Sequence, residues 1–313
     1  MVRFLLTRFG GAVVLAFIVS TGTFFLLSTA GADPAAALLG IDATSAQIAV
    51  KRAELGLDAP LFSRYLDWLG GALTGNLGTS WSTNQQVASL VATRLPVTLS
   101  LAVGAILLSS VLGITLGYVS AIKRGWLDRA LQFLVVIGYG LPGFWVALVL
   151  STVFAVQLGW FPATGYTPFT QSPSGWAGTV ILPIIALTLG VAASIAQQTR
   201  DSVLDVLRQG YVRTLRSRGL PHWRVLVLHV LRNAAAAPLG VISLQFIGLL
   251  GGAIMVENVF ALPGLGTFAV SSSISSDVPA ILGIVVVGAV TVVIVNLILD
   301  SVMAWLNPKV RTR

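Results

Sequence analysis

The chain has 313 residues, of which 56% are hydrophobic and 10% are charged, and its formal net charge is +8. Because soluble domains carry about 25% charged residues, this composition argues against a soluble fold and favours a polytopic membrane protein with helical spans of about 20 residues. The chain has no cysteine, which excludes disulfides and thiolate metal sites.

The first apolar segment covers about 9–30 and follows Arg3 and Arg8. The small residues of "TAGADPA" would suit cleavage of a signal peptide, but the apolar stretch is longer than the roughly 7–15 residues of a signal core. Since more apolar segments follow, we expect 1–30 to hold an uncleaved first membrane helix.

The segment 31–95 is more polar and carries local helix signals. Thr44 and Gln47 have the spacing of a capping box, and Gly56 is typical of a helix end. A second short helix is expected after Pro60, with one apolar face made of Phe62, Tyr65, Leu66 and Leu69. "TGNLGTSW" is typical of a turn-rich connection. We expect a small folded helical segment here.

Five further apolar spans are predicted at about 96–121, 131–157, 179–199, 235–256 and 279–306. Pro142 and Pro183 lie inside spans, where neighbouring helices can satisfy the freed backbone groups. The expected fold is all-α with six transmembrane helices. Its parts are the first helix (1–30), the helical segment (31–95), a five-helix core (96–306) and a tail (307–313).

The distribution of Lys and Arg predicts the orientation. The N-terminus, the 122–130 loop, the 200–234 loop and the C-terminus together carry 15 of the 19 basic residues, and the alternate segments carry 4. Both termini and the arginine-rich loop 200–234 are therefore predicted to be cytoplasmic, and 31–95 extracellular.

The arginine-rich loop holds seven of the sixteen arginines. Its apolar residues Leu204, Leu207, Tyr211 and Leu215 are spaced like one face of a helix. Gly219 interrupts this pattern, and Pro221 can begin a second helix. We expect two short helices joined by a sharp bend at "RGLP". Topology signals alone, or an amphipathic helix lying on the membrane surface, are simpler interpretations of the same residues.

The stretch "YVRTLRSRGLPHWRVLVLHVLRNAAAAPL" resembles the cytoplasmic loop of permease subunits of ABC importers, closest to the dipeptide, oligopeptide and nickel group. Its Tyr211, Arg213, Thr214, Gly219 and Leu220 match that group's pattern, whereas Leu215 and Ser217 replace alanines. "ADPAAALLG", "ELGLDAPLFSRYLDWL", "GNLGTS", "RLPVTLSLA", "LPGFW", "GWFPATGY" and "ENVFALPGLG" are similar to further segments of the group and follow in the same order.

The resemblance implies a type I importer permease fold and an inner-membrane subunit that moves di- or oligopeptides, with nickel or another small solute as the alternative cargo. It implies four kinds of partner: a second permease, expected to be a distinct paralogue, one or two ABC ATPases, an extracellular substrate-binding protein and the lipid bilayer. No nucleic acid is expected. The chain lacks the "GxxxxGK[ST]" phosphate loop, so we expect no cofactor here and assign ATP and Mg to the ATPases.

The resemblance also assigns candidate residues to two contacts. Those for coupling to the ATPase are Tyr211, Arg213, Thr214, Arg216, Arg218, Gly219, Leu220 and Pro221. The second contact is docking of the binding protein, for which the expected outer position makes the 31–95 region and Glu257, Phe260, Pro263, Gly264 and Gly266 candidates. A plain helix-capping loop is the alternative for Glu257 to Gly266.

Polar residues inside spans mark possible pathways, because they are costly when exposed to lipid. The candidates are Gln245, Asn296, Gln197 and Gln198, and the alternative is that these amides bond between helices.

Three other classes fit the sequence less well. An ion-coupled secondary transporter usually needs buried carboxylates or broken helices at repeat-related positions, and neither is apparent in the sequence. An intramembrane enzyme needs a catalytic motif, and the sequence has none. A channel needs no loop for docking an ATPase, so it would leave the arginine-rich loop unexplained. His222 and His229 lie seven apart in the arginine-rich loop and are not expected to bind metal. We therefore expect a transport subunit and not an enzyme.

Overall fold

The computed structural model describes residues 2–29, 33–40, 42–123 and 125–306. These residues form helices and connecting turns, and the only β-pairing among them is an isolated bridge between Thr79 and Gln86. The N-terminal residue, position 124 and the predicted tail 307–313, with its Lys309, Arg311 and Arg313, lie outside the described residues.

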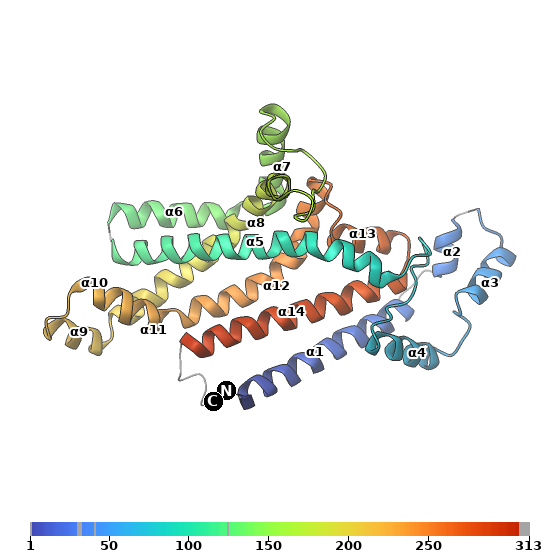
Figure 1. Cartoon of the computed structure of the whole chain (residues 1–313), viewed down its shortest axis with the longest axis horizontal. Helices are drawn as coiled ribbons and strands as arrows, with labels where there is room; N and C mark the ends of the chain where they lie inside the picture. Colours follow the sequence, from blue (N-terminus) through green and yellow to red (C-terminus); the bar gives the residue numbers. More distant parts are fainter. Residues whose placement is uncertain (1, 30–32, 41, 124, 307–313) are drawn as a thin grey trace. The chain divides into compact units, whose positions relative to one another are not determined.

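The chain divides into two compact units. The first unit comprises Met1–Leu6, Thr98–Leu262 and Val295–Arg313, and the second unit comprises Thr7–Val97 and Pro263–Ile294. Helices α1 (Val2–Thr29), α5 (Val87–Ile122) and α14 (Val278–Leu306) contribute to both. Figure 1 labels the helices, and each unit is described separately below.

Five helices of the described chain are long and apolar enough to cross a membrane, or six if one bent pair is a single span. The five are α1, α5, α8 (Pro173–Leu207), α12 (Ala236–Val259) and α14. The bent pair consists of α6 (Trp126–Gly140) followed by α7 (Gly143–Leu150) and the π-helical turn η1 (Ser151–Gln157). The six apolar segments predicted from the sequence are therefore found.

The third span is not the continuous helix predicted at 131–157. It bends by 95° between Gly140 and Gly143. Leu141 has extended backbone angles, φ −91° and ψ 117°, because the proline ring of Pro142 disfavours the helical conformation in the residue before it. Pro142 also has no N–H to continue the helical ladder. Pro183, by contrast, lies inside α8 as expected.

Helix α8 is the centre of the first unit, in which α6, α7 and α12 pack against it. Helix α5 approaches it closely through two glycines, one turn apart. A Cβ added to Gly117 would lie 2.2 Å from the carbonyl oxygen of Ala196, and one added to Gly113 would lie 2.6 Å from the Cβ of Ile195. Small residues at this spacing let helix backbones meet, so the two glycines set the α5–α8 distance.

The remaining helices of the first unit form the arginine-rich loop. They are α9 (Gly210–Ser217), α10 (His222–Arg224), the π-helical turn η2 (Val225–Leu231) and α11 (Arg232–Ala234). Figure 1 shows α9 and α10 together at one end of this unit.

The second unit holds α2 (Pro34–Leu39), α3 (Ser45–Glu54), α4 (Leu61–Leu73) and α13 (Leu265–Ile274) beside its parts of α1, α5 and α14. The predicted capping box is present, since the Thr44 side chain accepts from the Gln47 N–H and the Gln47 side chain accepts from the Thr44 N–H. Gly56, with φ +66°, follows the end of α3 as expected. The segment 31–95 is thus folded and helical where described.

The predicted apolar face of α4 is only partly correct. Tyr65 is buried against Phe24 of α1, and Leu69 packs on the same cluster. Phe62 and Leu66 are exposed. The buried face instead includes Leu61 and Trp68, because the position of α1 selects which side of α4 is covered.

Candidate functional site

The bend in the arginine-rich loop is built by a glycine turn at the end of α9. The Leu220 N–H donates to the Leu215 carbonyl at 3.4 Å, and the Gly219 N–H donates to the Arg216 carbonyl at 3.0 Å. These two bonds form a Schellman motif, in which the residue after the helix cap adopts a left-handed conformation. Gly219 has φ +77°. Pro221 is the N-cap of the next helix, which begins at His222, so the bend at "RGLP" is confirmed.

The arginine-rich loop has a hydrophobic core of its own. Val212 of α9 and Val225 of η2 are buried against Val203 and Val206 of α8, and Ala121 of α5 joins the same cluster. Leu215 and Leu220, on either side of the bend, pack on it. The loop is therefore fixed to the ends of α5 and α8, and a displacement of the loop would be passed to both helices.

The helical stripe predicted along this loop is divided between two helices. Leu204 and Leu207 belong to α8, whereas Tyr211 and Leu215 belong to α9. Leu204, Leu207 and Leu215 pack on the hydrophobic core of the loop, whereas Tyr211 is exposed. Helix α8 ends at Leu207. The Asn233 side chain donates to the Tyr211 hydroxyl at 3.1 Å and so ties α9 to α11.

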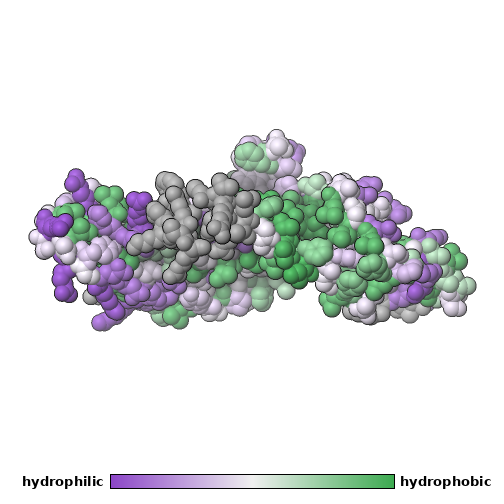
Figure 2. All heavy atoms as spheres, turned by 90° about the horizontal axis from the view of Figure 1, so that it is seen from below, coloured by the Kyte–Doolittle hydropathy of each residue, from purple (hydrophilic) through white to green (hydrophobic). Residues whose placement is uncertain are grey.

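Seven of the eight candidate coupling residues are exposed, and the eighth, Leu220, is half-buried. The exposed residues are Tyr211, Arg213, Thr214, Arg216, Arg218, Gly219 and Pro221. Trp223 is 59% exposed beside them, and the Arg224 guanidinium lies 5.5 Å from the centre of its ring. Figure 2 shows the hydrophilic surface gathered at this end of the first unit. The loop thus presents a basic face with an aromatic residue at its edge.

Arg200 differs from the other arginines of the loop, although the sequence groups it with them. Its guanidinium makes two hydrogen bonds to the Asp128 carboxylate of α6, at 2.8 and 2.9 Å. The two side chains are 22% and 17% exposed, and the Ser120 hydroxyl of α5 also donates to Asp128. Arg200 therefore joins three helices and does not contribute to the exposed basic face.

Gln245, one of the four candidate pathway amides, lines a groove of the first unit. This groove of about 400 Å³ lies between α7, α8 and α12. Its glycines Gly143, Gly190, Gly248 and Gly252 leave room beside the Gln245 side chain. Gly143 is the first residue of α7, directly after the 95° bend.

The other three amides are not brought together with Gln245. The Gln197 amide donates to Asp201 at 3.0 Å, and the Gln198 amide donates to Ser202 at 3.4 Å, in each case one turn along α8. The side-chain oxygen of Asn296 is buried without a hydrogen-bond partner among the described residues. A pathway role for any of the four stays a prediction.

The candidate docking residues lie where α12 ends and α13 begins, and the structure buries most of them. Glu257 is 0% exposed, and its carboxylate accepts a hydrogen bond from the Thr98 hydroxyl at 2.6 Å. Phe260, Gly264 and Gly266 are also buried. Pro263 is exposed. The side chains of Glu257 and Phe260 therefore face the protein interior, and a docking role for the five residues stays a prediction.

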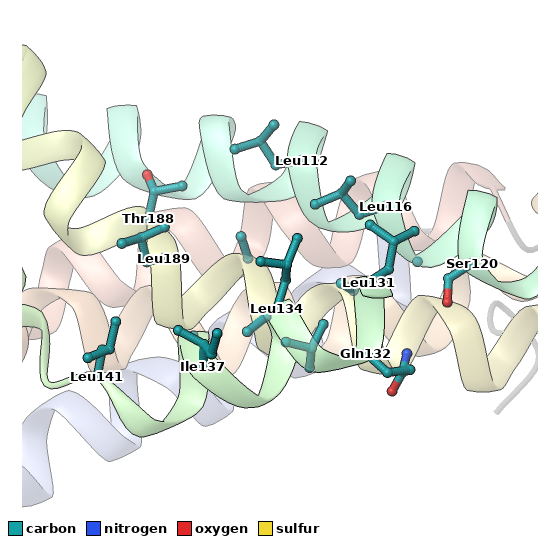
Figure 3. Close-up of a pocket in the computed structure, with 16 residues that line it drawn as sticks. Leu112, Leu116, Ser120, Leu131, Gln132, Leu134, Ile137, Leu141, Thr188 and Leu189 are labelled. Atoms are coloured by element: carbon teal, nitrogen blue, oxygen red, sulfur yellow. The ribbon is translucent and has the colours of Figure 1, made fainter. Parts of the chain in front are cut away.

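A second cavity of the first unit, about 240 Å³, lies between α5, α6 and α8. Figure 3 shows leucines of the three helices around it, with Ser120 and Gln132 at one end. Its lining is almost wholly apolar, so it offers no arrangement of polar groups for a solute. Among the described residues, no group of three or more His, Asp or Glu side chains is arranged to hold a metal ion.

Sequence reasoning missed a carboxylate latch in the second unit. Asp277, just before α14, accepts hydrogen bonds from the backbone N–H of Trp81 at 3.1 Å and from the N–H and hydroxyl of Ser82 at 3.2 and 2.7 Å. The Ser80 hydroxyl donates to it as well. Burial raises the pKa of Asp277, but the hydrogen bonds from Ser80 and Ser82 outweigh this and the pKa is lowered overall. The sequence signal was Asp277 in a helix N-cap position, but its partners lie almost 200 residues away.

Comparison with protein families matches nearly the whole chain. The family described as binding-protein-dependent transport system inner membrane component matches residues 109–312, and a model for the N-terminal part of such membrane components matches residues 1–102.

Several relatives match over their full length. A putative peptide transport system permease protein of Brucella abortus is 36% identical over 312 residues, which cover 99% of each chain. The di/tripeptide transport system permease protein of Pseudomonas aeruginosa and the glutathione transport system permease protein of Escherichia coli are each 34% identical, with 99% of each chain covered.

Among solved structures, the methionine ABC transporter MetNI in inward-facing conformations is similar with a TM-score of 0.57. The match covers 70% of this chain and 96% of that one at 18% identity, so the likeness concerns the fold alone. The predicted all-α importer-permease fold is confirmed.

Proposed function

Because the chain belongs to the family of binding-protein-dependent transport system inner membrane components, we propose that it forms half of the translocation pathway of an ATP-driven peptide importer. Family membership makes it a multi-pass inner-membrane transport subunit and not an enzyme. The cargo is inferred from the relatives, whose names specify peptides, di- and tripeptides or glutathione.

The path of helix α8 is the structural observation that most directly supports this proposal. Its end carries Val203 and Val206, which pack in the core of the arginine-rich loop. Further back along the same helix, Ala186, Leu187 and Gly190 line the groove that holds Gln245. A single rigid helix therefore connects the exposed basic face with the proposed pathway.

The proposed cycle uses this connection. Closure of two separate ATPase subunits on ATP displaces each docked loop, and α8 carries the displacement to the groove, which alternates between inward-facing and outward-facing states. The exposed Arg213, Arg216 and Arg218 contact the ATPase, while the extracellular binding protein delivers the peptide. Each partner can shift the equilibrium only through contacts that differ between the two states.

The proposal is tested by purifying the tagged chain from its native host in mild detergent and identifying what accompanies it by mass spectrometry. We expect a second permease, one or two ATPases and a lipid-anchored binding protein. A double substitution, Arg216→Glu with Arg218→Glu, should lose the ATPase and retain the second permease, because it reverses charge only on the exposed basic face. Recovery of a homo-oligomer without any ATPase would contradict the importer assignment.

Cargo is tested separately in proteoliposomes that contain the recovered subunits. Uptake of a labelled tripeptide that requires ATP and the binding protein is the expected result. Uptake of nickel without uptake of any peptide would replace the peptide assignment by that of a metal importer.

A further inference from the structure

A cavity of about 640 Å³ with both polar and apolar lining residues lies within the second unit, between α3, α4, the 76–84 loop and the first turn of α14. Cavities of about 300–1,000 Å³ are the usual size for small-molecule ligands. Four charged side chains line this cavity, namely Lys51, Glu54, Arg64 and Asp67. The presence of both signs of charge distinguishes it from the two cavities of the first unit.

Arg64 is a cation of this cavity without a carboxylate partner in the described chain. Lys51, by comparison, is paired with Glu54 at 3.0 Å, and neighbouring Arg52 is paired with two aspartates. Burial, and secondarily the charge of Arg52, lower the pKa of Arg64. The positive charge of Arg64 is therefore destabilised where it lies, and an entering anion would relieve this.

Trp68 supplies a second unused donor one turn further along α4. Its indole N–H is buried and has no hydrogen-bond acceptor among the described residues. The ring is held in place by stacking on Phe24, with the ring centres 5.4 Å apart. Residues four apart share one face of a helix, so Arg64 and Trp68 lie on the same side of α4. A carboxylate, with two acceptor oxygens, can satisfy both donors.

Asp67 provides an unpaired negative charge at the same cavity. Arg64 and Asp67 are three residues apart, a spacing at which opposite charges can pair on a helix. In the part of the chain that the structure describes, however, no hydrogen bond or ion pair joins them. Asp67 is exposed. Both charges therefore remain available to a ligand that carries the opposite sign at each end.

The part of the cavity lining around Ser80 and Trp81 is held in a defined shape. Ser80 and Trp81 line the cavity, and their hydroxyl and backbone N–H both bond to the Asp277 carboxylate. A site that is already ordered before binding loses less entropy when a ligand enters. The hydrogen bonds to Asp277 therefore hold Ser80 and Trp81 in place before a ligand enters the cavity.

We propose that this cavity is a subsite for short zwitterionic peptides, in which Arg64 and the Trp68 N–H bind the C-terminal carboxylate and Asp67 binds the α-ammonium group. The inference rests on the proposed peptide-importer function, and it assigns to this chain a peptide contact outside the Gln245 groove. It also gives the 31–95 segment a role in receiving cargo when the binding protein opens.

The test is equilibrium binding of labelled trialanine to the assembled permease complex in lipid nanodiscs, without the binding protein. We expect Arg64→Gln to weaken binding at least tenfold and Trp68→Phe to weaken it several-fold. Ser63→Ala, an exposed neighbour on α4, should leave binding unchanged. Trialanine amide should bind the unaltered chain about as weakly as trialanine binds the Arg64→Gln chain. In both cases the contact between the Arg64 guanidinium and a C-terminal carboxylate is missing.

A folding control separates loss of a ligand contact from loss of the folded complex. The thermal unfolding of each variant complex shows whether it is assembled and folded. Equal binding of trialanine and its amide, or unchanged binding by folded Arg64→Gln, would overturn the subsite. If Arg64→Gln instead weakened only docking of the binding protein, the cavity would belong to that partner.

The subsite and the proposed function can also fail separately. ATP-dependent peptide import by a complex that binds no trialanine in nanodiscs would overturn the subsite and leave the importer function intact. Failure to import any peptide would overturn the proposed function and the subsite with it.

Discussion

Gly219 shows how one residue sets the geometry of the arginine-rich loop. Its φ of +77° lies in the left-handed region, and an added Cβ would meet no atom within 4 Å. The requirement for glycine therefore comes from the backbone conformation and not from crowding. Left-handed backbone costs about 1–2 kcal/mol for ordinary L-residues, and Asn adopts it more readily than most.

This difference gives a matched pair of substitutions. We expect Gly219→Val to lower peptide-stimulated ATPase activity of the assembled complex strongly, because a β-branched side chain disfavours the bend that orients α9. Gly219→Asn should retain most of the activity. The measurement is ATP hydrolysis with and without loaded binding protein, in proteoliposomes with equal subunit content. Equal activity of the two variants would show that the bend does not control coupling.

Asp277 gives a residue-scale prediction of stability. Asp277→Asn should destabilise the second unit by about 1.5–3 kcal/mol, the usual contribution of a hydrogen bond to a charged group. Asp42→Asn, at an exposed position, should have little effect. The measurement is thermal unfolding of the purified complex followed by tryptophan fluorescence.

The pH dependence of this stabilisation follows from the direction of the pKa shift. The pKa of Asp277 is lowered in the folded chain, so its contribution is present above the unfolded value of about 3.9. That contribution is lost as pH falls through the lower folded value. The stability difference between the unaltered chain and Asp277→Asn should therefore shrink below about pH 4, and a difference that is constant across this range would contradict the latch.

At the scale of elements, the α5–α8 contact depends on a pair of glycines. Gly117→Ala should destabilise the first unit by about 1–3 kcal/mol, as overpacking of a close contact does, because the new methyl group would meet backbone 2.2 Å away. Gly240→Ala on α12 is the control, since nothing lies within 4 Å of its added Cβ. Thermal unfolding of both variants measures the difference, and equal stabilities would refute the close approach.

Most elements could be predicted from local sequence signals. The capping box at Thr44, the glycine end at Gly56 and the bend at Gly219 depend on residues within a few positions of one another, and all three are found. The third span shows the limit of a count of apolar residues. The sequence places Pro142 inside this span, but only the structure shows that Pro142 separates two helices, whereas Pro183 stays within one.

For the whole molecule, the orientation in the membrane remains a prediction from the charge distribution. The chain has no native cysteine, so single cysteines can report it. Ala46→Cys in α3 and Ser217→Cys in α9 are both at exposed positions. In intact spheroplasts, a membrane-impermeant maleimide should label the Ala46→Cys chain and spare the Ser217→Cys chain, which should react only after permeabilisation. The opposite pattern would reverse the topology.

The sequence by itself determined the membrane class, the six apolar segments, the arginine-rich loop and its bend, because these follow from composition and from neighbours along one helix. Only the tertiary structure decided that Arg200 joins Asp128, that Asp277 holds Ser80 and Ser82, and that Glu257 is buried. Those pairs are 72 and 195–197 residues apart. The packing of helices brings them together, and no local periodicity records which face of each helix that packing will cover.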